Sequence, residues 1–554
     1  MSPFTFGPTG RIVIAPEQRH MSALLAHQVR ERPDNPFLTI EGTTYSFKTA
    51  QETMLRVAAG LRGLGVREDA RVAALLPNCA AFVFVWLAAS HLGATIVAIN
   101  PEFRGRLLDA VLSDADCTVL VLHTVSADAL ASVSPVIRAR IGAVIRVDAH
   151  AEAFDGQISL AELVKKQSAD CPDAKGTLRS IHAISFTSGS TGPAKGVLIT
   201  NNQALDAACT YVHATQLSSN DVLYTPFAFF HGMSTRLGVV PALIVGAHVV
   251  VGIRFSASRY WQEASECGAT VGQTLPTMTA LLKALPTGAF DRTHRITRMY
   301  NSRCDEGFES RFGVRLVEAY GMTEIGLVIY TGFPDRRAGA AGKVHPDWEM
   351  AIFDEQDCPV PAGQPGELVF RPRAPWLMTT GYVGRPDATV EATRNLWFHS
   401  GDIGRQDEDG YVYFIDRRKE RIRRLGENIS SFDVESLVSS HPDVRECAAL
   451  AYPAAMGEDD VRIVVVMAED AQLNARQLYD WLTGVMPRYM LPRYIEFAAT
   501  LPRTATNKIE KFQLKEAGLA AGVWDRNAHL PDLRSKAKNV DPDLGGLLAI
   551  AKQQ

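Results

Sequence analysis

The chain has 554 residues, of which 46% are hydrophobic and 21% charged, so it can bury a large core and is long enough for more than one domain. A formal net charge of −4 gives no overall attraction to nucleic acid or to an anionic membrane. The eight cysteines are spread singly and form no CxxC pair, which argues against a zinc site or a disulfide framework and fits a reducing cytoplasm.

Two stretches could be mistaken for membrane-directed segments. The N-terminus lacks a basic start followed by an apolar core, so it does not have the pattern of a signal peptide. The most apolar run, 80–99, is interrupted at Ser90 and Gly93, whereas a membrane span needs a longer uninterrupted run. We therefore predict a buried helix over 82–92, a strand over 95–99 and no membrane span.

The first 417 residues alternate between short strands and helices. From about 45 to 300, runs rich in Val, Ile and Leu are separated by helical patterns such as 47–65, which predicts an α/β fold with largely parallel sheets. The strand-like runs are 71–77, 94–99, 117–122 and 143–148. From 340 to 416, short strands and Gly, Pro and Asp turns predict a small, mostly β subdomain, with a hairpin turn at Asp409-Gly410.

The pattern resets after 417. Helices are predicted over 430–441 and 474–486, and strands over 446–453, 461–469 and 493–499, which together make a small α+β unit. We expect an N-terminal domain over 1–417, a C-terminal domain over 418–520 and a polar tail over 521–554.

The stretch "TSGSTGPAKGV" (187–197) joins two predicted strands, 182–185 and 197–200. It is not a Walker A loop, which runs from a strand into a helix and reads GxxxxGK[ST]. Its glycines can turn backbone N–H groups towards an anion, while its hydroxyls and Lys195 add donors and charge. It is either a phosphate-binding loop or an ordinary polar hairpin loop.

Four further motifs follow this loop in order: "EAYGMTE" (318–324), "WFHSGD" (397–402), "DRRKERIRRLGENIS" (416–430) and "LPRTATNKIEK" (501–511). With the loop, they resemble the adenylate-forming superfamily of acyl-CoA synthetases, stand-alone adenylation domains and beetle luciferases, over roughly residues 20 to 515. The resemblance implies that a carboxylate attacks the α-phosphate of ATP, pyrophosphate leaves, and a thiol then attacks the acyl-adenylate. It implies ATP, Mg²⁺ and coenzyme A as cofactors, and a mobile C-terminal domain.

The resemblance also assigns roles to individual residues. The phosphate-binding candidates are Thr187, Ser188, Gly189, Ser190, Thr191, Gly192 and Lys195. The nucleotide and metal candidates in the second motif are Tyr320 on adenine, Gly321, Met322, Thr323 at the α-phosphate, and Glu324 on Mg²⁺. The remaining candidates are Asp402 and Arg417 on the ribose, Lys419 as the hinge, and Lys508 bridging the carboxylate and the α-phosphate. Lys508, Thr323 and Glu324 are the catalytic candidates. Taken singly, Tyr320, Asp402 and Arg417 also suit a half-buried aromatic, a turn cap and a surface arginine.

The acid-binding candidates are His231, Gly232, Tyr300, Asn301 and Gly326. The segments 223–238 and 325–332 combine large apolar residues with glycines and contain no acidic residue, so they favour a hydrophobic acid, polycyclic or of medium to long chain, over acetate or carnitine.

Two positions depart from the family pattern. Asn507 stands where a glycine usually precedes the C-terminal lysine, and 298–313 is shorter than usual. Similar shortening occurs in the carnitine and crotonobetaine CoA ligase branch, which is the nearest resemblance.

The sequence therefore predicts an AMP-forming acid–thiol ligase that uses a small-molecule, hydrophobic carboxylic acid and CoA. The alternatives are an enzyme that loads a carrier protein, a carnitine-type CoA ligase, and a non-catalytic binder of an acyl-adenylate or a nucleotide. We expect a cytoplasmic protein with no nucleic-acid partner, and a homodimer is left open.

Overall fold

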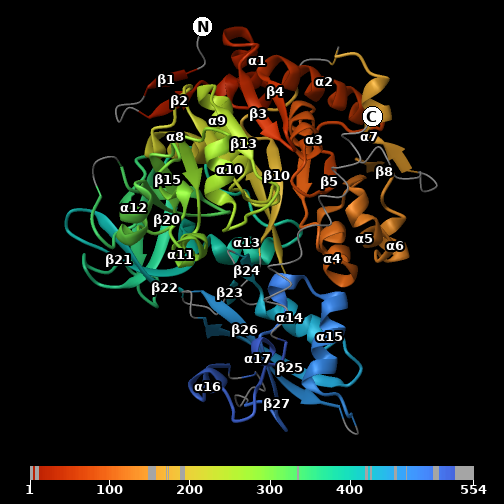
Figure 1. Cartoon of the computed structure of the whole chain (residues 1–554), viewed down its shortest axis with the longest axis vertical. Coiled ribbons are helices and arrows are strands. Elements are labelled where there is room, and N and C mark those ends of the chain that lie inside the picture. The colour runs from red at the N-terminus through yellow and green to blue at the C-terminus, as the bar shows by residue number, and fades with distance from the viewer. Residues whose placement is uncertain are drawn as a thin grey trace. The chain divides into compact units, whose positions relative to one another are not determined.

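The structure is a computed structural model. It describes residues 4–6, 11–147, 157–169, 171, 174–187, 194–332, 336–417, 422–424, 427–454, 458–468, 471–502, 509 and 511–530. The described residues form two compact units, one up to Arg417 (unit 1) and one from 422 to 530 (unit 2), and each is described by itself (Figure 1).

Unit 1 contains a seven-stranded sheet in the order β11-β10-β6-β5-β7-β8-β9. All neighbours are parallel except β10 and β11, which are antiparallel. The strands are β5 (Arg71–Leu75), β6 (Thr95–Ala98), β7 (Val119–Leu122), β8 (Ala143–Arg146), β9 (Gln157–Ser159), β10 (Ile181–Thr187) and β11 (Lys195–Thr200). Each predicted strand between 71 and 148 is present, which confirms the α/β prediction for this region.

A thirteen-stranded sheet completes most of unit 1, in the order β19-β20-β21-β22-β18-β17-β16-β15-β14-β12-β13-β3-β4. From β16 to β3 the neighbours are parallel, and from β16 through β17 and β18 to β19 they are antiparallel. The mostly β part predicted for 340–416 is therefore hydrogen-bonded to the parallel part through β17 and β18, and Gly410 turns the β21–β22 hairpin at φ 83°.

The strands of this sheet are β3 (Pro36–Ile40), β4 (Thr43–Ser46), β12 (Val222–Thr225), β13 (His248–Val251), β14 (Val271–Gln273), β15 (Arg298–Asn301), β16 (Arg315–Met322), β17 (Gly326–Tyr330), β18 (Gly342–Val344), β19 (Trp348–Phe353), β20 (Gly366–Pro372), β21 (Phe398–Gln406) and β22 (Tyr411–Arg417). A separate two-stranded sheet pairs β1 (Phe4–Phe6) with β2 (Ile12–Ile14).

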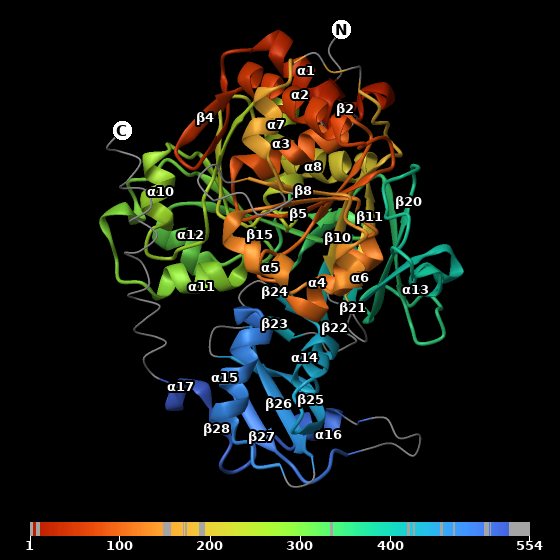
Figure 2. The same cartoon turned by 90° about the vertical axis from the view of Figure 1, so that its right-hand side faces the viewer.

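The helices of unit 1 cover both sheets, and α4, α5 and α6 lie together at one end (Figure 2). They are η1 (Pro16–Gln18), α1 (Met21–Glu31), α2 (Phe47–Gly63), α3 (Ala80–His91), α4 (Gly105–Ala115), η2 (Thr124–Ser126), α5 (Ala127–Ala131), α6 (Pro135–Arg138), α7 (Leu160–Lys165), α8 (Asn201–Thr215), η3 (Thr235–Val239), α9 (Val240–Val245), α10 (Tyr260–Glu266), α11 (Pro276–Ala284), η4 (Ala289–Asp291), α12 (Glu306–Phe312), α13 (Pro386–Ala392) and η5 (Arg394–Leu396). Helix α3 is buried on all sides over residues 82–91, as its almost entirely apolar sequence favours. Among the described residues, no helix combines the length and apolar character needed to cross a membrane.

Unit 2 is built on a four-stranded sheet, β25-β26-β27-β28, with the hairpin β23–β24 beside it. Its elements are β23 (Ile422–Arg424), β24 (Glu427–Ile429), α14 (Ser431–Val438), β25 (Val444–Pro453), β26 (Asp459–Met467), α15 (Ala475–Val485), η6 (Arg488–Met490), β27 (Tyr494–Phe497), α16 (Lys511–Glu516), β28 (Trp524–Asp525) and α17 (Arg526–His529). Asn474 and Gln477 form a capping box that starts α15. Residues 521–530, expected to open the tail, contribute β28 and α17 to this unit.

Candidate active site

The motif "AYGMTE" lies on the hairpin between β16 and β17. Met322 pairs with Gly326, so the chain reverses within three residues. A Cβ atom at Gly321 would overlap the Gly326 carbonyl, and Gly326 itself has φ 70°, a left-handed conformation that favours glycine. Both glycines are therefore required by the tight turn that presents Thr323 and Glu324.

One end of this hairpin brings two predicted nucleotide residues together. The Tyr320 hydroxyl donates to Asp402 Oδ2 at 2.8 Å, and Asp402 is only 1% exposed. The Tyr320 ring stacks on Phe370 with 5.9 Å between centroids. Asp402 lies on β21 opposite Arg417 on β22, so Asp402 links two candidates from other motifs, Tyr320 through its side chain and Arg417 through the strand register.

The other end of the hairpin holds Glu324, which is 4% exposed. The Tyr382 hydroxyl donates to Glu324 Oε1 at 3.0 Å, and Lys195 Nζ lies 5.1 Å from the centre of the Tyr382 ring. No other donor among the described residues bonds the Glu324 carboxylate side chain, which leaves acceptor oxygen for a hard cation. Sequence reasoning missed Tyr382, which lies between Glu324 and Lys195 because it bridges to Val197 of β11.

The hairpin rests on two helical segments through the carbonyl of Thr323. Gln203 Nε2 of α8 donates to this oxygen at 2.9 Å, and Arg236 Nη1 of η3 approaches it at 3.5 Å. Gln203 in turn lies in the first turn of α8, where the Thr200 side chain caps the helix. The position of Thr323 therefore depends on residues more than 80 positions away in sequence.

The predicted acid-binding segment forms the turn before η3. His231 packs against Phe230 with 4.5 Å between ring centres. A Cβ atom at Gly232 would overlap the Arg236 guanidinium, so this glycine makes room for the arginine. Burial lowers the pKa of Arg236 to about 10, and nearby Glu324 opposes that shift.

Two other acid-binding candidates, Tyr300 and Asn301, lie at the end of strand β15. The Tyr300 ring packs against Tyr211 of α8 at 5.6 Å. The Asn301 side chain turns onto its own loop, where it donates to the carbonyl of Arg303 and accepts from the N–H of Ser302. Tyr330, a residue suited to an aromatic cage for a cation, packs instead against His213 and His345.

The phosphate-loop prediction is only partly within the described chain. Thr187 and Lys195 form the last pair between β10 and β11, where the loop begins and ends. For Arg417 the structure describes the backbone alone. The candidates that lie outside the described residues are Ser188, Gly189, Ser190, Thr191, Gly192, Lys419 and Lys508.

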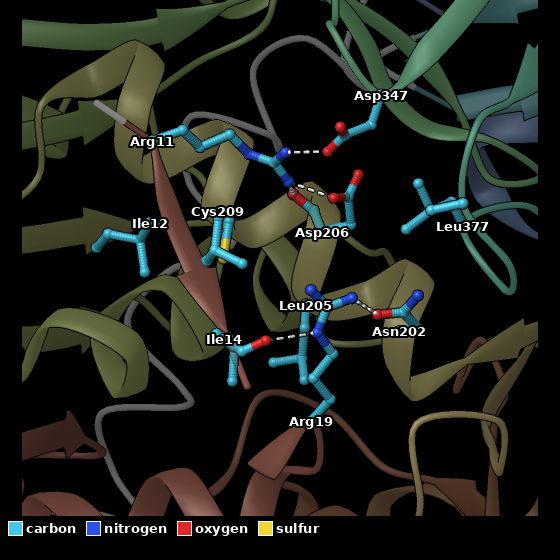
Figure 3. A pocket seen from close by; sticks show the side chains of 12 residues that line it. Arg11, Ile12, Ile14, Arg19, Asn202, Leu205, Asp206, Cys209, Asp347 and Leu377 are labelled. Atoms are coloured by element: carbon cyan, nitrogen blue, oxygen red, sulfur yellow. Dashed lines mark hydrogen bonds and ion pairs between the residues drawn. The ribbon is translucent and has the colours of Figure 1, made fainter. Parts of the chain in front are cut away.

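Unit 1 also has a cavity of about 230 Å³ that the sequence did not reveal (Figure 3). Arg11 reaches from the start of β2 and pairs with Asp206 of α8 and, at 2.7 Å, with Asp347. Asp206, Asp347 and His345 each bring one potential metal-ligand atom within 4.8 Å of the others. Arg11 already supplies a cation to both carboxylates, so we assign this cluster to stability.

The fold is that of the adenylate-forming enzymes, because solved members cover nearly all of the chain. An o-succinylbenzoate CoA synthetase from Bacillus subtilis aligns with a TM-score of 0.76 at 24% identity, over 89% of this chain and 98% of that chain. An amide bond synthetase from Marinactinospora thermotolerans aligns with a TM-score of 0.78 at 21% identity, over 90% and 99%.

The family follows from the sequence comparison. The model of the AMP-binding enzyme family matches residues 25–383, and that of the AMP-binding enzyme C-terminal domain matches 433–508. A crotonobetaine/carnitine–CoA ligase of Salmonella paratyphi A is 29% identical over 480 residues, which are 85% of this chain and 93% of the relative. Its counterpart in Salmonella typhimurium has the same identity and coverage. The chain belongs to the AMP-binding enzyme family and is an AMP-forming acyl-CoA synthetase, as its motifs predicted.

Proposed function

We propose that the protein activates a hydrophobic carboxylic acid as its acyl-adenylate and then transfers the acyl group to CoA, releasing AMP and pyrophosphate. The observation that carries the proposal is the β16–β17 hairpin, which places Tyr320 on Asp402 at one end and Glu324 beside Tyr382 and Lys195 at the other. In this proposal a nucleoside binds at the first end and the phosphates bind at the second.

In this proposal Tyr320 packs on adenine and Asp402 accepts from the ribose hydroxyls, with Arg417 beside them. Asp402 suits this role because a buried carboxylate can accept two hydrogen bonds and already orients the Tyr320 hydroxyl. Thr187, Lys195 and the loop 188–192 bind the β- and γ-phosphates. Thr323 contacts the α-phosphate.

Glu324 is the proposed ligand of Mg²⁺. Its carboxylate is buried and receives one phenolic hydrogen bond, and carboxylate oxygen is the donor that this cation prefers. Bound there, Mg²⁺ would neutralise charge that develops on the phosphates. Tyr382 would hold the orientation of Glu324, and Gln203 would hold the backbone of Thr323.

The proposal divides the chain into a domain over 1–417 and a mobile domain over 418–520, with Lys419 as the hinge. Lys508 would bridge the carboxylate and the α-phosphate during adenylation, where a fixed cation stabilises the charge that forms. A rotation at Lys419 would then remove Lys508 and admit the thiol. A cytoplasmic location fits the eight free cysteines, and a homodimer remains part of the proposal.

The acid itself is proposed to be hydrophobic. Phe229 and Phe230 line a narrow hollow together with Arg236, and Leu327 and Val328 are buried on strand β17 of the hairpin. A carnitine-type acid is the alternative that the Salmonella relatives favour by name. Arg236 opposes that alternative because it places a positive charge beside the predicted pocket.

An acid-dependent pyrophosphate-release screen, run with and without CoA, tests the proposal. We expect release that requires Mg²⁺, with AMP as the nucleotide product and an acyl-CoA only when CoA is present. Formation of ADP and phosphate in stoichiometric amounts would contradict it. Acyl-AMP that passes to a carrier protein and not to CoA would favour the carrier-loading alternative, and binding without turnover would favour the non-catalytic one.

A further inference from the structure

Arg236 is a cation with few partners inside unit 1. Its guanidinium fork offers five N–H donors, and the bond to the Thr323 carbonyl, at 3.5 Å, is long. Within the described ranges, no carboxylate lies within ion-pair distance of it. Gly232 leaves the space that the guanidinium fills. Arg236 therefore has hydrogen-bonding capacity that the described protein does not use.

His182 adds a second donor to the same place. Its side chain is 2% exposed, and its Nε2 accepts from Trp86 Nε1 at 3.2 Å, so the neutral ring carries its proton on Nδ1. Nδ1 is buried and has no hydrogen-bond partner among the described residues. Burial, together with a smaller contribution from the charge of Arg236, lowers the pKa of His182 to about 3, which keeps the ring neutral.

Arg236 and His182 both line a hollow whose walls are mostly apolar, with Ser185 and Thr235 also among its lining residues. Phe82 and Phe229 stack at 4.9 Å between centroids, and Trp86 and Phe230 complete the aromatic lining. Its volume is about 10 Å³, enough for about one oxygen atom or water. No carboxylate is among the residues that line it. The place is therefore complementary to an anionic oxygen carried on an apolar body, and it disfavours a cation.

We infer that Arg236 and His182 form an anion-recognition site for a second anionic oxygen group on one of the reactants, beyond the carboxylate that is activated. The inference rests on the proposed function, because it assigns the group to a reactant of that reaction. Two reactants could carry it: the acid, through a second carboxylate, or ATP, through a phosphate. The aromatic walls favour the acid, and the Arg236 side chain can shift to admit a carboxylate because a single long bond holds it.

The test compares acids that differ only by a second carboxylate: octanoate with octanedioate, and phenylacetate with 4-carboxyphenylacetate. Pyrophosphate release gives kcat/KM for each acid, and calorimetry gives the affinity for octanedioate and for pyrophosphate. The variants are Arg236→Met, which removes the charge, and Arg236→Lys, which keeps the charge but loses the fork. Arg30→Met, at an exposed position on α1, is the matched control. Thermal unfolding checks that every variant folds.

If the acid carries the group, the wild type prefers each dicarboxylate by about tenfold or more, and Arg236→Met loses that preference because kcat/KM falls for the dicarboxylates more than for their monocarboxylate partners. If ATP carries it, Arg236→Met weakens ATP and pyrophosphate by about tenfold with every acid alike. Arg236→Lys should retain part of either effect. The inference would be overturned if a folded Arg236→Met keeps both its preference for dicarboxylates and its affinity for ATP and pyrophosphate within about twofold of the wild type.

The calorimetric arm needs no turnover, so it separates this inference from the proposed function. If neither these acids nor those of the wider screen release pyrophosphate, the proposed function fails. Weaker binding of octanedioate or pyrophosphate to Arg236→Met would still support the anion site, and equal binding would overturn it.

Discussion

Replacing Arg11 by methionine is a direct test of what holds the N-terminal strands to α8. The Arg11 and Asp206 side chains are only 8% and 10% exposed, whereas Asp347 is 49% exposed. Although burial opposes a charge there, Asp206 raises the pKa of Arg11 above its usual value. In Arg11→Met, Asp206 would stay buried without its partner and Asp347 would regain water. Only the first of these carries a large cost.

Breaking one side of a buried pair costs about 3–5 kcal/mol, so we expect unit 1 to lose roughly that much. The double variant Arg11→Met/Asp206→Asn should recover about half of the loss, because it removes the uncompensated charge. The matched control is Arg373→Met, whose pair with Glu349 spans 3.4 Å with the arginine 57% exposed. It should cost at most about 0.5 kcal/mol.

Differential scanning calorimetry measures these effects, since it separates transitions if the two units unfold apart. In a unit of this size, about 2 °C or less of Tm accompanies each kcal/mol, so Arg11→Met should lower the Tm by about 5 °C. A loss below about 1 kcal/mol, or a double variant no more stable than the single one, would refute the view that an uncompensated buried charge sets the cost.

Three further outcomes are expected. Burial lowers the pKa of His182 to about 3 and that of His345 to about 4, from 6.5, so the unfolded chain takes up protons first and the free energy of unfolding falls as the pH drops below 6.5. The free energy of unfolding in urea should therefore be lower at pH 5 than at pH 7 by up to about 2 kcal/mol for each histidine. His345→Gln should remove the part of this difference that is due to His345. Lys508→Ala should slow adenylation by about 100-fold yet convert supplied acyl-adenylate to thioester, and equal loss of both steps would contradict its role. Lys419→Pro should keep pyrophosphate release but impair thioester formation in single-turnover assays, because proline fixes φ at the proposed hinge; unchanged thioester formation would place the hinge elsewhere.

The sequence predicted those parts of the fold in which local pattern and tertiary environment agree. Helix α3 is one example, since a run as apolar as 80–89 favours burial on every side, and the hairpin turn at Asp409-Gly410 is another, since Gly410 has a positive φ of 83°. These two features need no knowledge of distant contacts. The family resemblance assigned Tyr320 and Asp402 to one nucleotide, and the structure brings their side chains into a hydrogen bond that the sequence analysis did not predict.

What the sequence did not reveal depends on contacts or backbone geometry that a 3.6-residue period cannot anticipate. Segment η3 is π-helical: the N–H of Leu237 bonds the carbonyl of Gly232, five residues back. This wider turn changes which side chains face inwards, and it brings Arg236 to the hairpin, a contact that the sequence analysis did not predict. Arg11 and Asp347 are 336 positions apart, and no local pattern links them.

The names of the Salmonella relatives suggest carnitine as the acid, whereas the charge of Arg236 beside the proposed pocket disfavours a cationic acid. An estimate of the energies involved favours an acid without a cation. A quaternary ammonium about 5 Å from Arg236 would be repelled by about 3 kcal/mol at an effective dielectric constant near 20. An aromatic cage would return only about 0.5–2 kcal/mol, and Tyr330 packs on His213 and His345 instead. We therefore expect carnitine to be a poorer substrate than its uncharged carbon isostere, 3-hydroxy-5,5-dimethylhexanoate, by about tenfold or more in kcat/KM, and Arg236→Met to narrow that gap. Equal or better use of carnitine by the wild type would show that the site compensates the ammonium in a way that Arg236 does not disturb.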